Sequence, residues 1–235
     1  MKRILLCSGD IPKGISEILE TLRYEVMRIP ESHVLAKPVA LHPDMLFSLV
    51  GKRTILTDKA YCLSNAAFFK ALEEKGVKVT VSKSSLSEKY PLDILFDAIK
   101  TEKLLIGNLK YTAPELFSDG ITCVNVKQGY ALCSTALLKD AAITADKGIA
   151  DALEENGYDV LRISPGGIAL NGYDFGFIGG ASAVLEDAKA VVFFGDIKRH
   201  PSGNDIILFC KKNGYKVYFD DSFPLTDYGG AKELL

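Results

Sequence analysis

The sequence predicts an α/β protein of five ββαβ units arranged as a five-fold pseudo-symmetric propeller, with residues 1–235 forming a single domain. Three observations support this. A junction of helix end, stop residue and strand recurs along the chain. A short opening stretch and a turn precede most of these junctions, which indicates a hairpin ahead of each helix. The spacing of the units closes only if the last unit is shared by the two ends of the chain.

The elements follow from local patterns, and the stretch from Gly129 to Ser164 shows them best. Ile149 and Leu153 are four residues apart, which predicts a short amphipathic helix over 147–155. Asn156 and Gly157 end that helix, because both tolerate the left-handed conformation of a C-cap. Similar patterns predict strands at 3–8, 24–29, 54–57, 77–81, 104–106, 121–126, 130–138, 141–144, 158–163, 190–194 and 215–219, and helices at 12–22, 65–75, 114–117 and 205–212.

The repeated junction is the strongest signal. It occurs as EEKGVKV, FSDGITCV, EENGYDV and KKNGYKV, and a fifth copy, TLRYEV, lacks the glycine. The opening stretches are HPDMLF, PLDILF, ALCSTA, GYDFGF and LTDYGG, which we expect to be strands. Their third residues are Asp44, Asp93, Cys133, Asp174 and Asp227.

The spacing from these third residues to the next junction valine is 35, 31, 27 and 43 residues for the first four units. The longest spacing includes a polar segment, 195–204, expected to be a solvated loop with Asn204 or Asp205 as helix N-cap, or else a lid. Asp227 has only eight residues after it, so its partner is the N-terminal unit with Val26; counted through both termini, the spacing is 34. Pairing of the terminal strands would close the ring. The alternative is an open, doubly wound sheet, which also shows strand–helix–strand units.

Composition excludes several classes of function. The chain is 48% hydrophobic with a net charge of −2 and no large basic face, so we expect a buried core and no nucleic-acid partner. The apolar runs are strand-sized, so no membrane span is expected, and no signal peptide is recognised. Five scattered cysteines without Cys-x-x-Cys spacing indicate reduced thiols in a cytoplasmic protein rather than a disulfide scaffold or zinc site. We expect no metal and no cofactor.

On these residues the chain resembles the pentein, or guanidino-group-modifying, superfamily. Arginine and agmatine deiminases, amidinotransferases and dimethylarginine dimethylaminohydrolases share that fold, as does a ribosome anti-association factor that is not an enzyme. His42-Pro43-Asp44 is similar to the family's His-x-Asp/Glu motif, and the segment 132–138 around Cys133 resembles the nucleophile strand of the dimethylarginine hydrolases. Asp174 stands where the family has a guanidinium-binding carboxylate.

Two features depart from that pattern. The family order is carboxylate, histidine, cysteine, whereas here it is His42, Cys133, Asp174. The two orders agree if this chain is a circular permutant, since permutation preserves spatial neighbours when termini are adjacent. The family's Gly-Gly run beside its cysteine has no counterpart at Cys133.

The resemblance implies a chemistry. A guanidinium is a planar cation that carboxylates bind through paired N–H groups, so Asp174, Asp93 and Asp227 are the candidate substrate-binding residues. Cys133 would attack the guanidinium carbon to give a thiouronium intermediate. His42 would protonate the leaving amine and then activate water, and Asp44 would orient the substrate or His42.

Each of these residues also has an ordinary structural role. A cysteine in an apolar strand is commonly a small core residue, and Asp93 or Asp227 could bond backbone amides in turns. The sequence therefore supports two function classes. One is a cysteine-dependent hydrolase or transferase of a guanidino or amidino compound. The other is a catalytically silent ring that binds a cationic ligand or a macromolecule.

Overall fold

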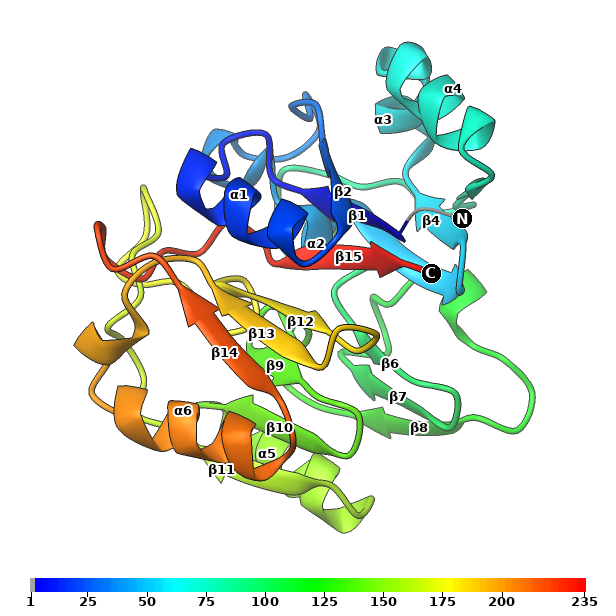
Figure 1. Cartoon of the computed structure of the whole chain (residues 1–235). Coiled ribbons are helices and arrows are strands. Elements are labelled where there is room, and N and C mark those ends of the chain that lie inside the picture. The colour runs from blue at the N-terminus through cyan, green and yellow to red at the C-terminus, as the bar shows by residue number, and fades with distance from the viewer. Residues whose placement is uncertain (1–2) are drawn as a thin grey trace.

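A computed structural model describes residues 3–235, which contain five three-stranded sheets built on one plan. In each sheet an inner strand pairs antiparallel with a middle strand, which pairs parallel with an outer strand. A helical segment connects the middle and outer strands and lies on the outside of the ring (Figure 1). This is the predicted ring of ββαβ units, and the open sheet is excluded.

The strands, in order inner, middle, outer, fall into five groups. They are β15 (Ala231–Leu234), β1 (Arg3–Cys7) and β2 (Tyr24–Arg28); β3 (Phe47–Gly51), β4 (Thr54–Thr57) and β5 (Lys78–Val81); β6 (Ile99–Lys100), β7 (Leu104–Gly107) and β8 (Thr122–Asn125); β9 (Thr135–Leu137), β10 (Ala141–Thr144) and β11 (Asp159–Arg162); and β12 (Ser182–Leu185), β13 (Ala190–Phe193) and β14 (Lys216–Phe219).

Helical segments complete the units. Those between middle and outer strands are α1 (Lys13–Thr21), α3 (Lys59–Ser64), α4 (Ala66–Glu74), η2 (Pro114–Leu116), α5 (Lys147–Glu155), η3 (Ile197–Arg199) and α6 (Gly203–Lys212). Two more, η1 (Lys37–Val39) and α2 (Pro43–Leu46), connect the first unit to the second. None of the helices in residues 3–235 is long and apolar enough to span a membrane.

The two ends of the chain close the ring, as predicted. β15 pairs antiparallel with β1, with Ile4 opposite Leu234 and Cys7 opposite Ala231. Figure 1 shows β15, in red, beside the blue strands of the first unit, and β15 also contacts β3 and β12 of the neighbouring units. Met1 and Lys2, which the sequence places ahead of the first strand, lie outside the described residues.

The five junctions share one backbone conformation. Each helix or turn is followed by a residue with positive φ: Gly76 (78°), Gly120 (78°), Gly157 (87°), Gly214 (83°) and, in the copy without glycine, Arg23 (69°). A left-handed residue at this place lets the chain reverse from the helix into the outer strand. The conformation therefore belongs to the repeat and is kept even where the sequence has arginine.

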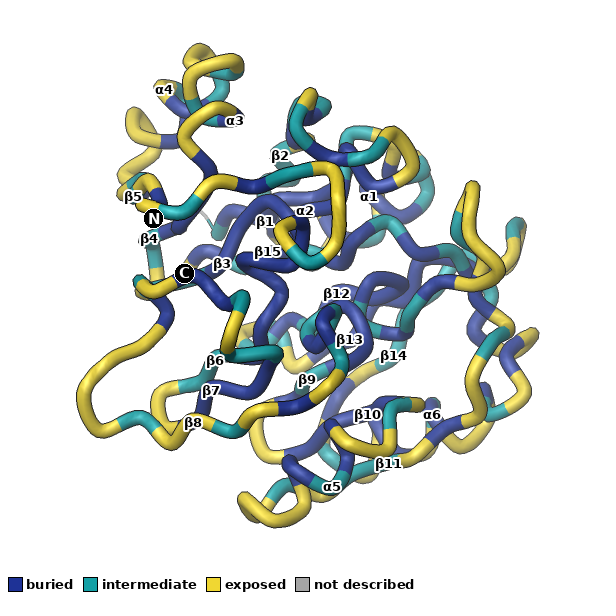
Figure 2. The backbone as a smooth tube through the Cα atoms, turned by 180° about the vertical axis from the view of Figure 1, so that it is seen from behind, coloured by how far each residue is buried: buried dark blue, intermediate teal, exposed yellow. Residues whose placement is uncertain are grey.

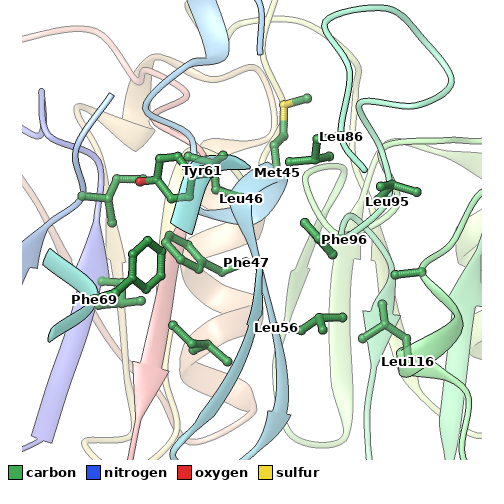
Figure 3. Packing of buried hydrophobic residues seen from close by; sticks show 14 of the residues in the cluster. Met45, Leu46, Phe47, Leu56, Tyr61, Phe69, Leu86, Leu95, Phe96 and Leu116 are labelled. Atoms are coloured by element: carbon green, nitrogen blue, oxygen red, sulfur yellow. The ribbon is translucent and has the colours of Figure 1, made fainter. Parts of the chain in front are cut away.

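The hydrophobic core is a ring of clusters between neighbouring units rather than one central core. The largest joins the first three units, and Figure 3 shows its aromatic centre, where Tyr61 lies edge-on to Phe47 and Phe69 at 5.7 Å between ring centroids. Three further clusters join the third unit to the fourth, the fourth to the fifth, and the fifth to the first. Figure 2 shows the consequence: the strands toward the middle of the molecule are buried and exposed residues concentrate in outer helices and turns.

The opening stretches are not the strands that the sequence predicted. Residues 43–46 form the helical turn α2, residues 131–134 form a turn, and the inner strands begin only after them, at Phe47 and Thr135. The stretches at 91–96, 173–177 and 225–230 likewise precede their inner strands. These residues form the turns and loops that lead into the inner strands, so the chain is irregular there.

The polar segment 195–204 is also more ordered than expected. It contains η3, and α6 begins at Gly203 with Ser202 as N-cap, not at Asn204 or Asp205. The backbone packs tightly here, because a Cβ on Gly203 would come within 2.1 Å of the Ile197 carbonyl oxygen. His200 in this segment is buried, which excludes a fully solvated loop.

Candidate active site

The candidate site is built from the turns that precede the inner strands. His42 is the N-cap of α2, and Pro43 occupies the first helical position, where its missing N–H costs nothing. The Asp44 N–H donates to the Gly229 carbonyl at 3.1 Å, which ties α2 to the turn before β15. Cys133 lies in the turn before β9. Residues far apart in the sequence thus meet at one end of the axis.

Cys133 is held by two carboxyl groups. Its Sγ donates to Asp44 Oδ2 at 2.6 Å, and its backbone N–H donates to Asp97 Oδ1 at 2.9 Å. Cys133, Asp44 and Asp97 are all buried. The second oxygens, Asp44 Oδ1 and Asp97 Oδ2, have no hydrogen-bond partner among the described residues. The thiol is therefore fixed in position, and its neighbours have spare acceptors.

His42 lies against the same group. Its Nδ1 is 4.0 Å from Asp44 Oδ1 and 3.7 Å from Asp227 Oδ1. Asp227 is held by two backbone donors, the N–H of Phe177 at 2.8 Å and that of Gly229 at 2.9 Å. The imidazole thus stands between two carboxyl groups that are themselves fixed.

Two glycines make this close approach possible. A Cβ on Gly229, whose φ is +75°, would lie 2.4 Å from the His42 Cα. A Cβ on Gly179 would lie 2.6 Å from the Cys133 carbonyl oxygen, and the next residue, Gly180, donates its N–H to that carbonyl at 3.1 Å. A Gly-Gly pair therefore packs against Cys133 in space, although none adjoins it in the sequence.

Above these groups is a cavity of about 250 Å³, which we call the chamber. Cys133, His42 and Asp227 contribute to its wall. Its other lining residues are Val39, Met45, Tyr130, Leu170, Tyr173, Asp174, Phe175 and Phe177. The chamber gives a small ligand access to the thiol and the imidazole together.

The electrostatics of the site favour neutral groups at rest. Burial raises the pKa of the Cys133 thiol well above its ordinary value, and Asp44, Asp97 and Asp227 raise it further. Burial also lowers the pKa of His42, against the opposing effect of Asp44.

The carboxyl groups hold protons more tightly than usual for the same reason. Burial raises the pKa of Asp97 to about 8, with a contribution from Asp44, and raises that of Asp227 to about 6. The pKa of Asp44 is also raised, chiefly by burial. The resting site therefore stores protons that a bound cation would help to release.

The structure brings together four of the six residues singled out from the sequence: His42, Asp44, Cys133 and Asp227. The expectation that all four aspartates converge is wrong for the other two. Asp93 is buried but accepts a hydrogen bond from the Tyr130 hydroxyl at 2.7 Å and does not line the chamber. Asp174 is exposed and reaches only the chamber wall. All five opening stretches are irregular and not strands, so the repeat spacing did not fix where each of their side chains points. The substrate-binding role of Asp93 and Asp174 stays a prediction.

Two residues of the site were missed. Asp97 lies two residues before the start of the third unit's inner strand and four residues after the aspartate that the repeat singled out. Lys232 lies on β15, buried, on the same face as Leu234. Burial lowers the pKa of Lys232, and Asp44, Asp97 and Cys133 oppose that effect. The alternation in Ala231–Leu234 is the signal that could have found it, since it places a lysine on a core-facing position.

The same cluster could hold a metal ion. His42, Asp44 and Cys133 each offer one ligand atom, and these atoms lie within 4.8 Å of one another. Nitrogen, sulfur and carboxylate oxygen are the ligands that Zn²⁺ takes in proteins. The expectation of no metal stays a prediction.

Comparison with solved structures defines the class of fold. The structure is similar to an amidinotransferase of the saxitoxin biosynthetic pathway from Microseira wollei, with a TM-score of 0.59 and 11% identity over 100% of this chain and 94% of that one. It is similar to the inosamine-phosphate amidinotransferase of Streptomyces griseus, with a TM-score of 0.56 and 14% identity over 94% and 78% of the two chains. It is also similar to a dimethylarginine dimethylaminohydrolase, with a TM-score of 0.55 and 10% identity over 94% and 93%.

These similarities, with the five ββαβ sheets, establish the pentein fold, as the sequence resemblance indicated. A family model matches residues 6–231, and the chain belongs to that family, described as "Family of unknown function (DUF6873)". No curated protein sequence matches the chain. The circular permutation stays a prediction.

Proposed function

We propose that this protein is a hydrolase or transferase that acts on a guanidino or amidino compound through Cys133. One observation carries the proposal. The thiol is hydrogen-bonded to a buried carboxyl group, with an imidazole within 4.8 Å, on the wall of a chamber open to a small ligand. A nucleophile within reach of an acid–base pair is the arrangement that covalent catalysis requires.

The proposed reaction has two stages, which share the intermediate on Cys133. Sγ of Cys133 bonds to the guanidinium carbon, and the thiol proton passes to the Asp44–His42 pair. That proton then moves to the leaving nitrogen as the C–N bond breaks, which frees an amine and leaves an amidino group on sulfur. Water, or an acceptor amine in a transferase, adds to the same carbon and gives its proton to the pair. The C–S bond breaks, and the proton returns to the thiol.

A cationic substrate is what this site needs to become reactive. At rest the thiol is neutral, because burial and three nearby carboxyl groups raise its pKa. A guanidinium in the chamber would add a positive charge beside the sulfur, and an opposite charge favours the ionised form of a thiol. Binding and activation would therefore occur together, and the free enzyme would keep an inert cysteine.

The structural neighbours support the class of substrate. Their names describe amidinotransferases and a dimethylarginine dimethylaminohydrolase, all of which share the fold of this chain. A sequence identity of 10–14% supports a shared fold, so the proposed chemistry is argued from the residues of this chain.

Labelling with a cationic alkylating agent tests the proposal. Chloroacetamidine carries the substrate's cationic head, and iodoacetamide is a neutral counterpart. We expect the ratio of the chloroacetamidine rate to the iodoacetamide rate to be at least about tenfold higher at Cys133 than at Cys123, because about 1.4 kcal/mol of charge stabilisation corresponds to a factor of ten. The exposed Cys123 is the internal control and should show no such preference. Peptide mass spectrometry gives both rates.

His42→Ala should slow the labelling of Cys133 and abolish turnover of guanidines while circular dichroism shows an intact fold. Cys210→Ala is the matched control, since Cys210 is buried in the core away from the site and its loss should leave labelling unchanged. Equally slow labelling of Cys133 by both reagents would contradict a nucleophilic role.

The raised pKa of Cys133 favours one alternative, a silent ring that binds a cation without chemistry. In that case guanidinium compounds would raise the melting temperature by mass action, as any ligand of the native state does, with no product and no preferential alkylation. Binding and labelling measured on one sample thus separate the two functions.

A further inference from the structure

The wall of the chamber differs in character from its floor. We call the part of the lining formed by Cys133, His42 and Asp227 the floor and the rest of the lining the wall. The floor is polar, whereas much of the wall is aromatic or aliphatic. Tyr130 stacks on Phe177 at 6.2 Å between ring centroids with 29° between planes, and Phe175 lies edge-on to Phe177 at 6.3 Å. These rings and the thiol line the same chamber, so a ligand bound there is close to both.

The aromatic wall is joined to the floor. The N–H of Phe177 donates to Asp227 Oδ2 at 2.8 Å, so the carboxyl group at the floor and the ring above it have a fixed relation. The segment 170–177 supplies Leu170, Tyr173, Asp174, Phe175 and Phe177 to the lining. Selection of the part of the substrate away from the guanidinium therefore falls mainly to this one segment.

The chamber is lined by acidic side chains and, apart from His42, by no basic side chain among the described residues. Asp174 and Asp227 are the acidic lining residues, and none of the described residues that line it is lysine or arginine. The buried Lys232 borders a different cavity. A carboxylate on the substrate would meet two aspartates and no basic side chain, in surroundings where an unpaired charge is costly.

We propose that the substrate is a guanidine whose substituent is apolar or aromatic and carries no carboxylate, so that arginine itself is a poor substrate. The inference rests on the proposed function for its reaction and on the chamber wall for its selectivity. The rings of Tyr130 and Phe177 would cover an alkyl or aryl group. The exposed carboxylate of Asp174 would accept a second cation at the far end, so an amine there is tolerated and a carboxylate is repelled.

A matched pair of ligands tests the carboxylate alone. Propylguanidine and 4-guanidinobutanoate differ only in that group, and agmatine and arginine form a second pair that also carries an amine. We expect kcat/KM for the member without carboxylate to be about 100-fold higher in each pair, the order expected when like charges are brought together in a recognition site. Phenethylguanidine should be at least as good a substrate as propylguanidine.

Asp174→Asn should reduce the ratio within each pair, since it removes one of the two repelling charges, and it should weaken agmatine relative to propylguanidine. Asp119→Asn, an exposed aspartate outside the chamber, is the control and should leave both ratios unchanged.

The outcomes separate this inference from the proposed function. If arginine or 4-guanidinobutanoate is turned over as well as its partner or better, the inference is wrong and the proposed function stands. If guanidines bind without turnover, dissociation constants by calorimetry give the same ratios and decide the inference for a silent ring. If none of these guanidines binds and chloroacetamidine shows no preference for Cys133, both the inference and the proposed function fall.

Discussion

The two sides of the Cys133–Asp44 pair are built differently. On one side is the chamber, whose wall consists mostly of irregular segments and aromatic rings. On the other is a cavity of about 570 Å³, here called the funnel, whose wall includes a polar residue from each inner strand: Ser48, Lys100, Thr135, Ser182 and Lys232. Cys133 borders the chamber, Asp44 borders the funnel, and the 2.6 Å hydrogen bond between them joins the two sides.

The difference shows where a repeated fold can place chemistry. Regular strands give each unit a residue in the funnel wall, and the five residues named are two lysines and three hydroxyl side chains. Irregular turns let individual residues depart from the repeat, and at the chamber end they bring one thiol, one imidazole and several carboxyl groups within a few ångströms. The funnel side also contributes positive charge to this cluster, through the buried Lys232.

The largest effect is expected from Gly229→Ala, which acts on the chamber side. The new Cβ would lie 2.4–2.6 Å from Cα, Cβ and Cγ of His42, so the imidazole must move. A displacement near 1 Å in a catalytic group can cost about 100-fold in rate, and we expect at least that loss in turnover and in alkylation of Cys133 by chloroacetamidine.

Gly120→Ala is the matched control for this change. Like Gly229, Gly120 has a positive φ, here +78°, but a Cβ at Gly120 would meet nothing within 4 Å. Both variants should lose about 1–3 kcal/mol of stability from backbone strain, as chemical denaturation measures. Only Gly229→Ala should lose activity beyond that. Equal activities in the two variants would show that the position of His42 is unimportant.

A smaller effect is expected from Lys232→Met, which acts from the funnel side. Removing the buried cation takes positive charge away from Asp44, Asp97 and Cys133, so the thiol should ionise at higher pH. We expect chloroacetamidine to label Cys133 about tenfold more slowly, corresponding to one pKa unit, with the rate profile displaced to higher pH. Lys52→Met, at an exposed lysine of the funnel wall, should change neither. An unchanged profile in Lys232→Met would assign the lysine a purely structural role.

The regular part of the molecule was predictable and the irregular part was not. Strands 54–57 and 141–144 and the helix 147–155 agree with the structure residue for residue, because alternation, helical spacing and stop residues are local properties. The closure of the ring also followed from the repeat, since β15 has no partner within its own end of the chain.

The site was predicted only in part, for the same reason. The repeat spacing predicted Asp44, Cys133 and Asp227, whereas His42 was predicted from the resemblance of His42-Pro43-Asp44 to a family motif. The spacing failed at Asp93, whose neighbour Asp97 bonds the Cys133 backbone instead, because a shift of four residues within a turn leaves the spacing of the repeats almost unchanged. The alternation in Ala231–Leu234 marks Lys232 as core-facing, but the groups that surround it are brought there only by the closed ring.

The smallest effect concerns Asp97, which lies behind the thiol and lines neither cavity. Burial raises its pKa to about 8, above the value near 4 of an unfolded aspartate. Between those values the folded protein binds a proton that the unfolded chain has lost, so the free energy of unfolding falls as pH rises. The stabilisation that the Asp97 proton provides is complete below about pH 4 and is lost by about pH 8. Between these values the free energy of unfolding falls by no more than about 1.4 kcal/mol per pH unit.

Asp97→Asn should flatten this dependence while keeping an oxygen acceptor for the Cys133 N–H, and urea denaturation at intervals from pH 5 to pH 9 measures it. Asp227, with a pKa of about 6, has the same sign and His42, whose pKa is lowered, has the opposite sign, so Asp97 is assessed from the difference in slope between Asp97→Asn and the native protein from pH 6 to pH 8. Asp119→Asn, at an exposed position, should leave the slope in that window unchanged. A slope that Asp97→Asn does not reduce would mean that Asp97 is already ionised at neutral pH in the folded protein.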